Sequence, residues 1–185
     1  MFDSGSTTQI GVYIGRFNPI HKGHQMTLEK MLHNHTSDRS LIVIGSANAT
    51  LSLRNLFTYK ERRNFIQTLY PKAKIAPLAD QMADEDWFSS LLDLVHIAFP
   101  FHHNINLYCG DLKDVIDFDH KDKVTIHIID RYKEQVYSAT EVRTRIMMAE
   151  KRELTGLLDE RILDSVYDLG RMRLKALVRG EQDGY

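Results

Sequence analysis

The chain has 185 residues, 43% of them hydrophobic, which is enough for one well-packed domain rather than two. Its 24 Lys and Arg residues nearly balance 25 Asp and Glu residues, so the overall charge indicates neither nucleic acid nor an anionic membrane as a partner. Cys109 is the single cysteine, which excludes an internal disulfide, and no apolar run is long enough to span a bilayer. We therefore expect a cytosolic protein with one domain over residues 1–185, in which any anion site is local.

Short apolar strands alternate with amphipathic helices, which predicts an α/β fold: a Rossmann-like, doubly wound parallel sheet with C-terminal helices. The Ser-rich segment 1–8 is expected to be a disordered lead-in and 181–185 a frayed tail or linker. The first strand is expected at Gly11–Ile14, and a helix near His21 has the apolar face Met26, Leu28, Met31 and Leu32. Further strands are expected at Leu41–Gly45, Lys74–Leu78, Ile105–Cys109 and Val124–Ile129, the last with one less buried face.

Capping residues mark the beginnings of three later helices. Thr58 followed by Glu61 has the capping-box pattern, and Ser138 followed by Glu141 repeats it. Asp84 is the expected cap of a helix with a broad apolar face. That face consists of Trp87, Phe88, Leu91, Leu92, Val95 and Ile97.

The stretch from Gly15 to His24 follows the first strand directly, and Gly15 and Pro19 separate that strand from the next helix. A helix N-terminus is therefore expected at the carboxyl end of the first strand, where open parallel sheets bind ligands and free N–H groups favour phosphate. The side chains gathered there all donate hydrogen bonds to oxyanions: Arg16, His21, Lys22 and His24.

Other interpretations of the two histidines are weaker. A lone histidine would more often belong to a partly buried helix start, and a catalytic zinc site usually needs a third protein ligand, which no adjacent Glu or Cys supplies. The chain contains neither G-x-G-x-x-G nor G-x-x-x-x-G-K-[ST]. The motif His21-Lys22-Gly23-His24 resembles the signature of the HxGH nucleotidylyltransferase superfamily. The resemblance implies that Gly23 lets the backbone approach a triphosphate, which His21 and His24 contact.

A second motif comprises Ser138, Thr140 and Arg143. Alone, it is as typical of a well-capped surface helix as of a ligand site. Beside an HxGH turn, it resembles the second motif of the superfamily, Ser-x-Thr-x-x-Arg, which holds the β- and γ-phosphates of a nucleoside triphosphate. Two helix N-termini converging on one triphosphate would each offer about half a positive charge and free N–H donors.

A third resemblance narrows the family. The segments Ser46–Asn48 and Arg54–Arg62 are similar to the part of archaeal-type nicotinamide-nucleotide adenylyltransferases that reads Gly-Ser-Ala-Gln, then Arg-Asx-Pro-Phe-Thr-x-x-Glu-Arg. Here Asn48 replaces the Gln and Leu56 stands where Pro is usual. The similarity continues through Pro77-Leu78-Ala79-Asp80, Trp87, Gly110-Asp111 and Arg131-Tyr132, and so covers nearly the whole chain.

This resemblance implies adenylyl transfer from ATP to nicotinamide mononucleotide, giving NAD and pyrophosphate, with Mg²⁺ carried on ATP and no metal held by the protein. The implied catalytic residues are Arg16, His21, Lys22 and His24. The implied ATP-binding residues are Gly15, Phe17, Gly23, Arg54, Gly110, Ser138, Thr140 and Arg143. The implied mononucleotide-binding residues are Asn48, Asp80 and Trp87, although helix-face packing also explains Trp87, and a solvated loop charge also explains Arg54.

Two alternatives stay open. A sister transferase acting on phosphopantetheine or a cytidylyl acceptor would use the same motifs without needing Trp87 beside Asp80. A non-catalytic nucleotide sensor is also compatible with the fold. Adenine-contacting groups are expected near the fifth strand and the loop 132–137. Some relatives carry a second, Nudix-class hydrolase domain; no Glu-rich helix of that class is visible here, and a homo-oligomer is left open.

Overall fold

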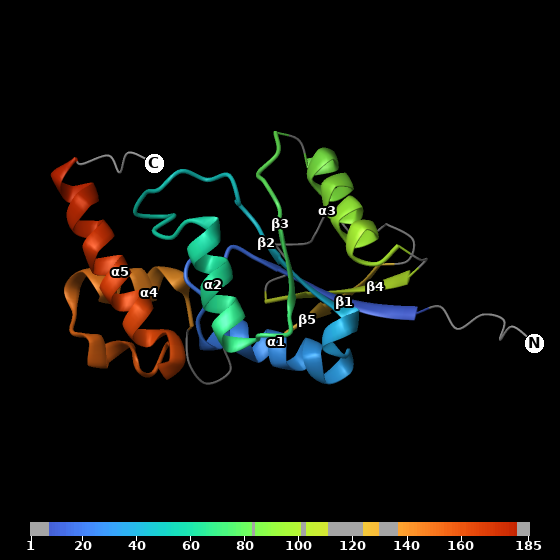
Figure 1. Ribbon diagram of the computed structural model, residues 1–185, viewed down its shortest axis with the longest axis horizontal. Helices are drawn as coiled ribbons and strands as arrows, with labels where there is room; N and C mark the ends of the chain where they lie inside the picture. Colours follow the sequence, from blue (N-terminus) through green and yellow to red (C-terminus); the bar gives the residue numbers. More distant parts are fainter. Residues whose placement is uncertain (1–7, 83, 101–102, 111–123, 130–136, 181–185) are drawn as a thin grey trace, which may run out of the picture.

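The computed structural model describes residues 8–82, 84–100, 103–110, 124–129 and 137–180. Its strands form one five-stranded parallel sheet in the order β3-β2-β1-β4-β5 (Figure 1). The strands are β1 (Thr8–Gly15), β2 (Ser40–Ile44), β3 (Lys74–Pro77), β4 (His103–Cys109) and β5 (Val124–Ile128). The helices are α1 (Lys22–Asn34), α2 (Tyr59–Leu69), α3 (Asp84–Ala98), α4 (Ala139–Met148) and α5 (Glu160–Arg179), with short 3-10 turns η1 (Ser37–Arg39) and η4 (Lys151–Leu154). The predicted α/β fold with C-terminal helices is confirmed.

Helices cover both faces of the sheet, and each face has its own hydrophobic core. On one face α3 packs Phe88, Leu91 and Val95 against buried residues of β1, β2 and β4. The other face lies against α1 and α2, whose core continues into α4 and α5. Figure 1 shows α3 on one side of the sheet, α1 and α2 on the other, and α4 with α5 at the end opposite the N-terminus. Burial on both faces explains why β2, which is buried along its whole length, reads as a continuous apolar run.

The capping predictions are confirmed in part. Thr58 caps α2, and its side chain and that of Glu61 accept hydrogen bonds reciprocally from the backbone. Ser138 caps α4 by accepting a hydrogen bond from the Glu141 N–H at 3.0 Å. The Glu141 carboxylate instead pairs with Arg145 at 2.6 Å, so the second box is only half formed.

Three apolar residues that the sequence pattern assigned to buried faces are exposed to solvent. The exposed fractions are 43% for Met26, 79% for Ile97 and 50% for Ile128. On α1 and α3, a residue two positions from a buried one lies about 200° around the helix. Met26 therefore points away from the buried side chain of Leu28. Ile128 lies on β5, an edge strand that is less covered than the centre of the sheet.

Element boundaries also differ from the predictions. The strand β1 begins at Thr8, so the last residue of the predicted lead-in is part of the sheet, and β4 begins at His103, two residues early. The helix α3 begins at Asp84, which makes this residue the first of the helix rather than its cap. Residues 1–7 and 181–185, predicted to be frayed, lie outside the described residues. None of the described helices combines the length and hydrophobicity needed to cross a membrane.

Candidate active site

A cleft of about 970 Å³ lies where β1, β2 and β4 end. The chain leaves β1 toward β2 and β3 on one side and later returns to β4 and β5 on the other. The carboxyl end of β1 is thus the point where the strand order reverses, and ligands of open α/β sheets bind at such points. The cleft is lined from all three strand ends, by Gly15 after β1, Ser46 after β2, and Gly110 after β4.

The turn after β1 brings two histidine rings together at the beginning of α1, tilted by 32° to each other. The rings of His21 and His24 have centroids 3.7 Å apart, and both side chains are buried. His24 Nδ1 accepts the backbone N–H of His21 at 3.3 Å. In a neutral imidazole one nitrogen accepts while the other carries the proton, so this bond assigns the proton of His24 to Nε2. His24 therefore lines the cleft with Nε2 as its hydrogen-bond donor.

Gly23 allows the two motifs to approach each other. A Cβ at this position would lie 2.6 Å from Cβ of Tyr137 and 3.2 Å from the ring of His21. Tyr137 directly precedes Ser138, the cap of α4. The missing side chain therefore makes room for the second motif, a contact within the protein that adds to the close approach of phosphate expected from the sequence.

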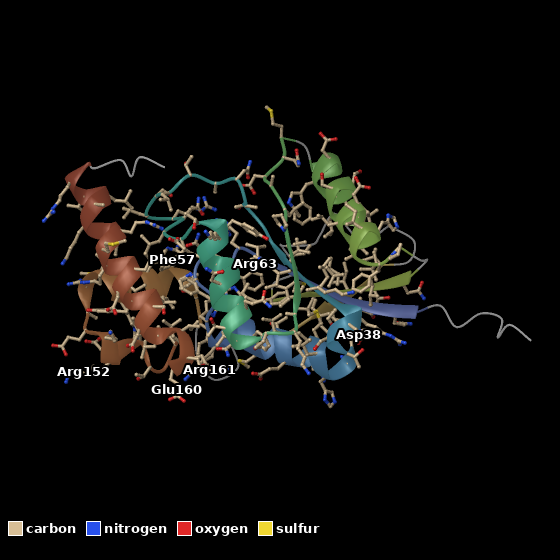
Figure 2. All side chains as sticks on the ribbon, viewed as in Figure 1. Asp38, Phe57, Arg63, Arg152, Glu160 and Arg161 are labelled. Atoms are coloured by element: carbon tan, nitrogen blue, oxygen red, sulfur yellow. The ribbon has the colours of Figure 1, made fainter. Side chains whose placement is uncertain are left out.

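The N-terminus of α4 enters the cleft beside the histidine turn. Arg143 Nη1 donates to the carbonyl oxygen of Asn18 at 2.7 Å, and its Nη2 donates to Thr140 Oγ1 at 3.0 Å. Asn18 is itself fixed, because its amide exchanges two hydrogen bonds with the backbone of Phe57. Phe57 in turn packs against Phe65 of α2, with ring centroids 5.3 Å apart, and is labelled beside that helix in Figure 2.

Three guanidinium groups face the same space. Burial lowers the pKa of Arg143, and the nearby charges of Arg16 and Arg54 lower it further. All three residues line the cleft, and Arg16 and Arg54 are exposed to solvent. An arrangement in which like charges oppose one another favours a ligand with several negative charges.

Asp80 and Trp87 line the same cleft. The carboxylate of Asp80 accepts a hydrogen bond from the hydroxyl of Ser46 at 2.9 Å. The backbone N–H of Asp80 donates to Asn48 Oδ1 at 2.8 Å. Trp87 is half-buried, lines the cleft and also packs against the core under α3. Both explanations considered for Trp87 therefore have a structural basis.

The structure brings most of the predicted site residues to one place. The predicted residues that line the cleft are Gly15, Arg16, Phe17, His21, His24, Arg54, Asp80, Trp87, Gly110, Ser138, Thr140 and Arg143. Gly23 lies behind the histidine rings. Asn48 does not line the cleft and reaches it only through the backbone of Asp80.

Lys22 is not brought into the cleft. Its Nζ donates to the carbonyl oxygen of Thr155 at 2.9 Å, and the residue borders a separate hollow near the beginning of α5. Lys22 therefore does not line the cleft beside Arg16 in this structure, and its catalytic role stays a prediction.

Sequence reasoning assigned no role to several lining residues, namely Tyr13, Asn18, Ser46, Asn55, Tyr108 and Tyr137. Asn18 lies inside the first motif, but its contact to Phe57 spans 39 residues and has no local signal. Of the quoted motif residues, Asp111, Arg131 and Tyr132 lie outside the described residues, as do most of the loop 132–137 and any adenine contacts it makes.

Residues 12–145 match the family model described as Cytidylyltransferase-like. This chain belongs to the cytidylyltransferase-like family. The match begins in β1 and ends in α4, so it contains both motifs that line the cleft. Family membership therefore agrees with the position of the cleft.

Two archaeal relatives carry the same name. A nicotinamide-nucleotide adenylyltransferase of Methanolobus tindarius is 26% identical over 176 residues, which cover 92% of this chain and 95% of the relative. The protein of that name from Pyrococcus horikoshii is 28% identical over 177 residues, covering 90% and 88%. These relatives confirm the predicted resemblance to archaeal nicotinamide-nucleotide adenylyltransferases.

A solved structure shows the same fold. The bifunctional NMN adenylyltransferase/ADP ribose pyrophosphatase of Francisella tularensis, complexed with AMP and a manganese ion, has a TM-score of 0.69 at 24% identity. The match covers 94% of this chain and 55% of that protein, so this chain spans about half of its length.

Proposed function

We propose that this protein is a nicotinamide-nucleotide adenylyltransferase that joins ATP and nicotinamide mononucleotide to give NAD and pyrophosphate. The observation that carries the proposal is the single cleft in which the histidine turn and the N-terminus of α4 face Asp80 and Trp87. The archaeal relatives, similar over about nine tenths of the chain, support the same reaction.

The reaction is an in-line attack of the mononucleotide phosphate on the α-phosphorus of ATP. The attacking oxygen is already anionic, so neither a protein nucleophile nor a general base is required. Catalysis then reduces to positioning the two phosphates and stabilising the charge of the pentacoordinate centre.

The triphosphate lies between the two helix N-termini. His21 and His24 contact the α- and β-phosphates from one side, with Arg16 nearby. Ser138, Thr140 and Arg143 hold the phosphates that leave as pyrophosphate. The three guanidinium groups of the cleft neutralise the negative charge of this tail, which explains why they are close together with no carboxylate ion pair among the described residues.

A divalent metal ion accompanies the nucleotide in this class of enzyme, and the Francisella structure contains manganese with AMP. Among the described residues, no group of three or more His, Cys, Asp or Glu side chains could hold a metal ion. A donor set of arginines, histidines and hydroxyls suits phosphate rather than a hard cation. We propose that Mg²⁺ enters on the phosphates of ATP, where it shields their charge.

The mononucleotide occupies the end of the cleft beside Trp87 and Asp80. The indole stacks on or walls the nicotinamide ring, whose positive charge an aromatic face attracts. Asn48 contributes by holding the backbone of Asp80 rather than by touching the ligand.

A coupled assay of dinucleotide formation tests the function. Purified protein is supplied with ATP and, in separate reactions, nicotinamide mononucleotide, nicotinic acid mononucleotide and phosphopantetheine, and pyrophosphate release is measured. Release with nicotinamide mononucleotide supports the proposal. Release with phosphopantetheine alone would assign a sister transferase, and ATP binding without release from any acceptor would assign a nucleotide sensor.

The remaining features of the proposal concern the setting of the enzyme. The described residues form one sheet with its helices, which supports a single transferase domain over this chain. A lone cysteine suits the reducing cytosol. Some relatives carry a fused Nudix domain, which is not identified in this chain, and a homo-oligomer stays an open alternative.

A further inference from the structure

Arg62, near the beginning of α2, is a buried cation whose partners are all backbone carbonyl groups. Its Nη1 donates to the carbonyl oxygens of Arg16 at 2.7 Å and Gly45 at 2.8 Å. Its Nη2 donates to Ser46 at 2.9 Å, and its Nε to Thr58 at 3.4 Å. The side chain is only 2% exposed and makes no ion pair within the described part of the chain. A buried charge requires such partners, so the four carbonyls must stay in place around it.

The carbonyls of Arg16 and Gly45 lie in two unusual turns. Phe17, after Arg16, has a φ of 47°, and Ser46, after Gly45, has a φ of 48°. Among the described residues, these are the only non-glycine positions with positive φ. L-residues adopt this conformation reluctantly, so each turn needs contacts that hold it. The guanidinium of Arg62 supplies one such contact directly before each left-handed residue.

Both turns line the cleft and contribute residues to different proposed subsites. The turn after β1 presents the side chain of Arg16 to the phosphate side. The turn after β2 presents Ser46, whose hydroxyl donates to Asp80 at 2.9 Å. One guanidinium thus ties the backbone of the phosphate side to that of the mononucleotide side.

We propose that Arg62 is a positioning residue that fixes the distance between the two substrate subsites through the backbone of Arg16 and Ser46. The proposal rests on the proposed function, because it assigns the subsites to ATP and the mononucleotide. Arg62 touches neither substrate. It acts by keeping the attacking phosphate and the α-phosphorus in register, and misplacement by about 1 Å can cost on the order of 100-fold in rate.

Arg62→Lys is the informative variant, because it keeps the charge and most of the side-chain volume. Lysine has three donors on a flexible stem and lacks the planar fork that reaches both turns at once. Arg63→Lys is the matched control, because Arg63 is the next residue of α2 and is exposed. Arg63 is labelled beside α2 in Figure 2. We expect Arg62→Lys to lower kcat/KM by roughly 10-fold to 100-fold for both substrates, and Arg63→Lys to stay within about twofold.

Binding can be followed without turnover, since Trp87 is the only tryptophan of the chain and lines the cleft. Its fluorescence is titrated with ATP and with the mononucleotide, separately and together. In the wild type, we expect the Kd of each ligand to be the same whether or not the other ligand is present. In Arg62→Lys, we expect each ligand to bind more weakly when the other is already bound than when it is titrated alone.

A double-mutant cycle distinguishes positioning from general destabilisation. If Arg62 acts through Arg16, then Arg62→Lys should change the KM for ATP by less than about twofold in an Arg16→Ala background. If it also acts through Ser46, its effect on the mononucleotide should shrink in a Ser46→Ala background. Fully additive effects in both backgrounds would overturn the proposal.

Arg173 provides a control for stability alone. It is a second buried arginine, on α5, and pairs with Glu61 at 2.7 Å while donating to the carbonyl of Leu56. Arg173→Lys should lower the melting temperature without raising both KM values. If it reproduces the kinetic pattern of Arg62→Lys, the pattern reflects stability and the proposal fails.

The remaining outcomes are also decisive. Wild-type kinetics in Arg62→Lys would overturn the proposal. If Arg62→Lys does not fold, Arg62→Met is measured instead, and failure of both to fold while Arg63→Lys folds would assign Arg62 to stability only. An inactive wild type whose Trp87 fluorescence still responds to ATP would reject the proposed function, and the fluorescence cycle would still test Arg62.

Discussion

Replacing Gly23 by alanine tests whether the two motifs must touch. The new Cβ would lie 2.6 Å from Cβ of Tyr137, about 0.8 Å short of ordinary contact at 3.4 Å. Alanine is the better helix former by up to about 1 kcal/mol, whereas overpacking costs about 1–3 kcal/mol. The helix preference offsets only part of the overpacking cost, so we expect a loss of stability of about 0–2 kcal/mol. The clash is relieved by moving Tyr137, and with it Ser138, away from His21.

Activity should fall far more than stability does. A shift of about 0.8 Å separates the two groups that hold the triphosphate, and misplacement of about 1 Å can cost on the order of 100-fold in rate. The assay is kcat/KM for ATP beside the melting temperature. Gly45→Ala is the comparison, because its Cβ would meet no atom closer than 3.9 Å. Wild-type kcat/KM in Gly23→Ala would refute the idea that this glycine joins the motifs.

Three further variants test the proposed roles of cleft residues. His24→Ala should lower kcat by on the order of 100-fold or more with little change in ATP affinity, because its Nε2 donor acts mainly on the transition state; equal, small losses would contradict this. Arg143→Lys keeps the charge but loses the fork that joins Asn18 to Thr140, so kcat/KM for ATP should fall, and unchanged kinetics would remove Arg143 from the site. Trp87→Ala should raise the KM for the mononucleotide several-fold while that for ATP is unchanged; a melting temperature lowered by the loss of about 3–5 kcal/mol, with both substrates affected alike, would indicate a core role instead.

Local patterns were sufficient for the elements that frame the cleft. Strand, turn and helix from Gly11 to His24 follow from an apolar run, Gly and Pro breakers and a helical period. The cap at Thr58 follows from a pattern three residues long. These features depend on residues that are close together in the sequence. They can therefore be predicted from the sequence alone.

Long flexible side chains and long-range contacts were beyond such reasoning. Lys22 lies inside a motif, but its flexible four-carbon side chain lets its ammonium donate a hydrogen bond to the carbonyl oxygen of Thr155, 133 residues away. Asn48 occupies a ligand-like position in a loop, yet the backbone of Asp80 takes its side-chain oxygen. In both cases the polar end of the side chain forms a hydrogen bond within the protein instead of lining the cleft.

The residues that break local rules gather at the cleft. Phe17 and Ser46 are in the left-handed region, which costs an L-residue about 1–2 kcal/mol each, and both line the cleft. Arg16, Arg54 and Arg143 line the same cleft, and the repulsion between their positive charges is a second energetic cost. Strain and like charges persist where function requires them and the surrounding structure holds them, here through two hydrophobic cores and the buried contacts of Asn18 and Arg62. The position of the site therefore follows from these costs, independently of the motif that first indicated it.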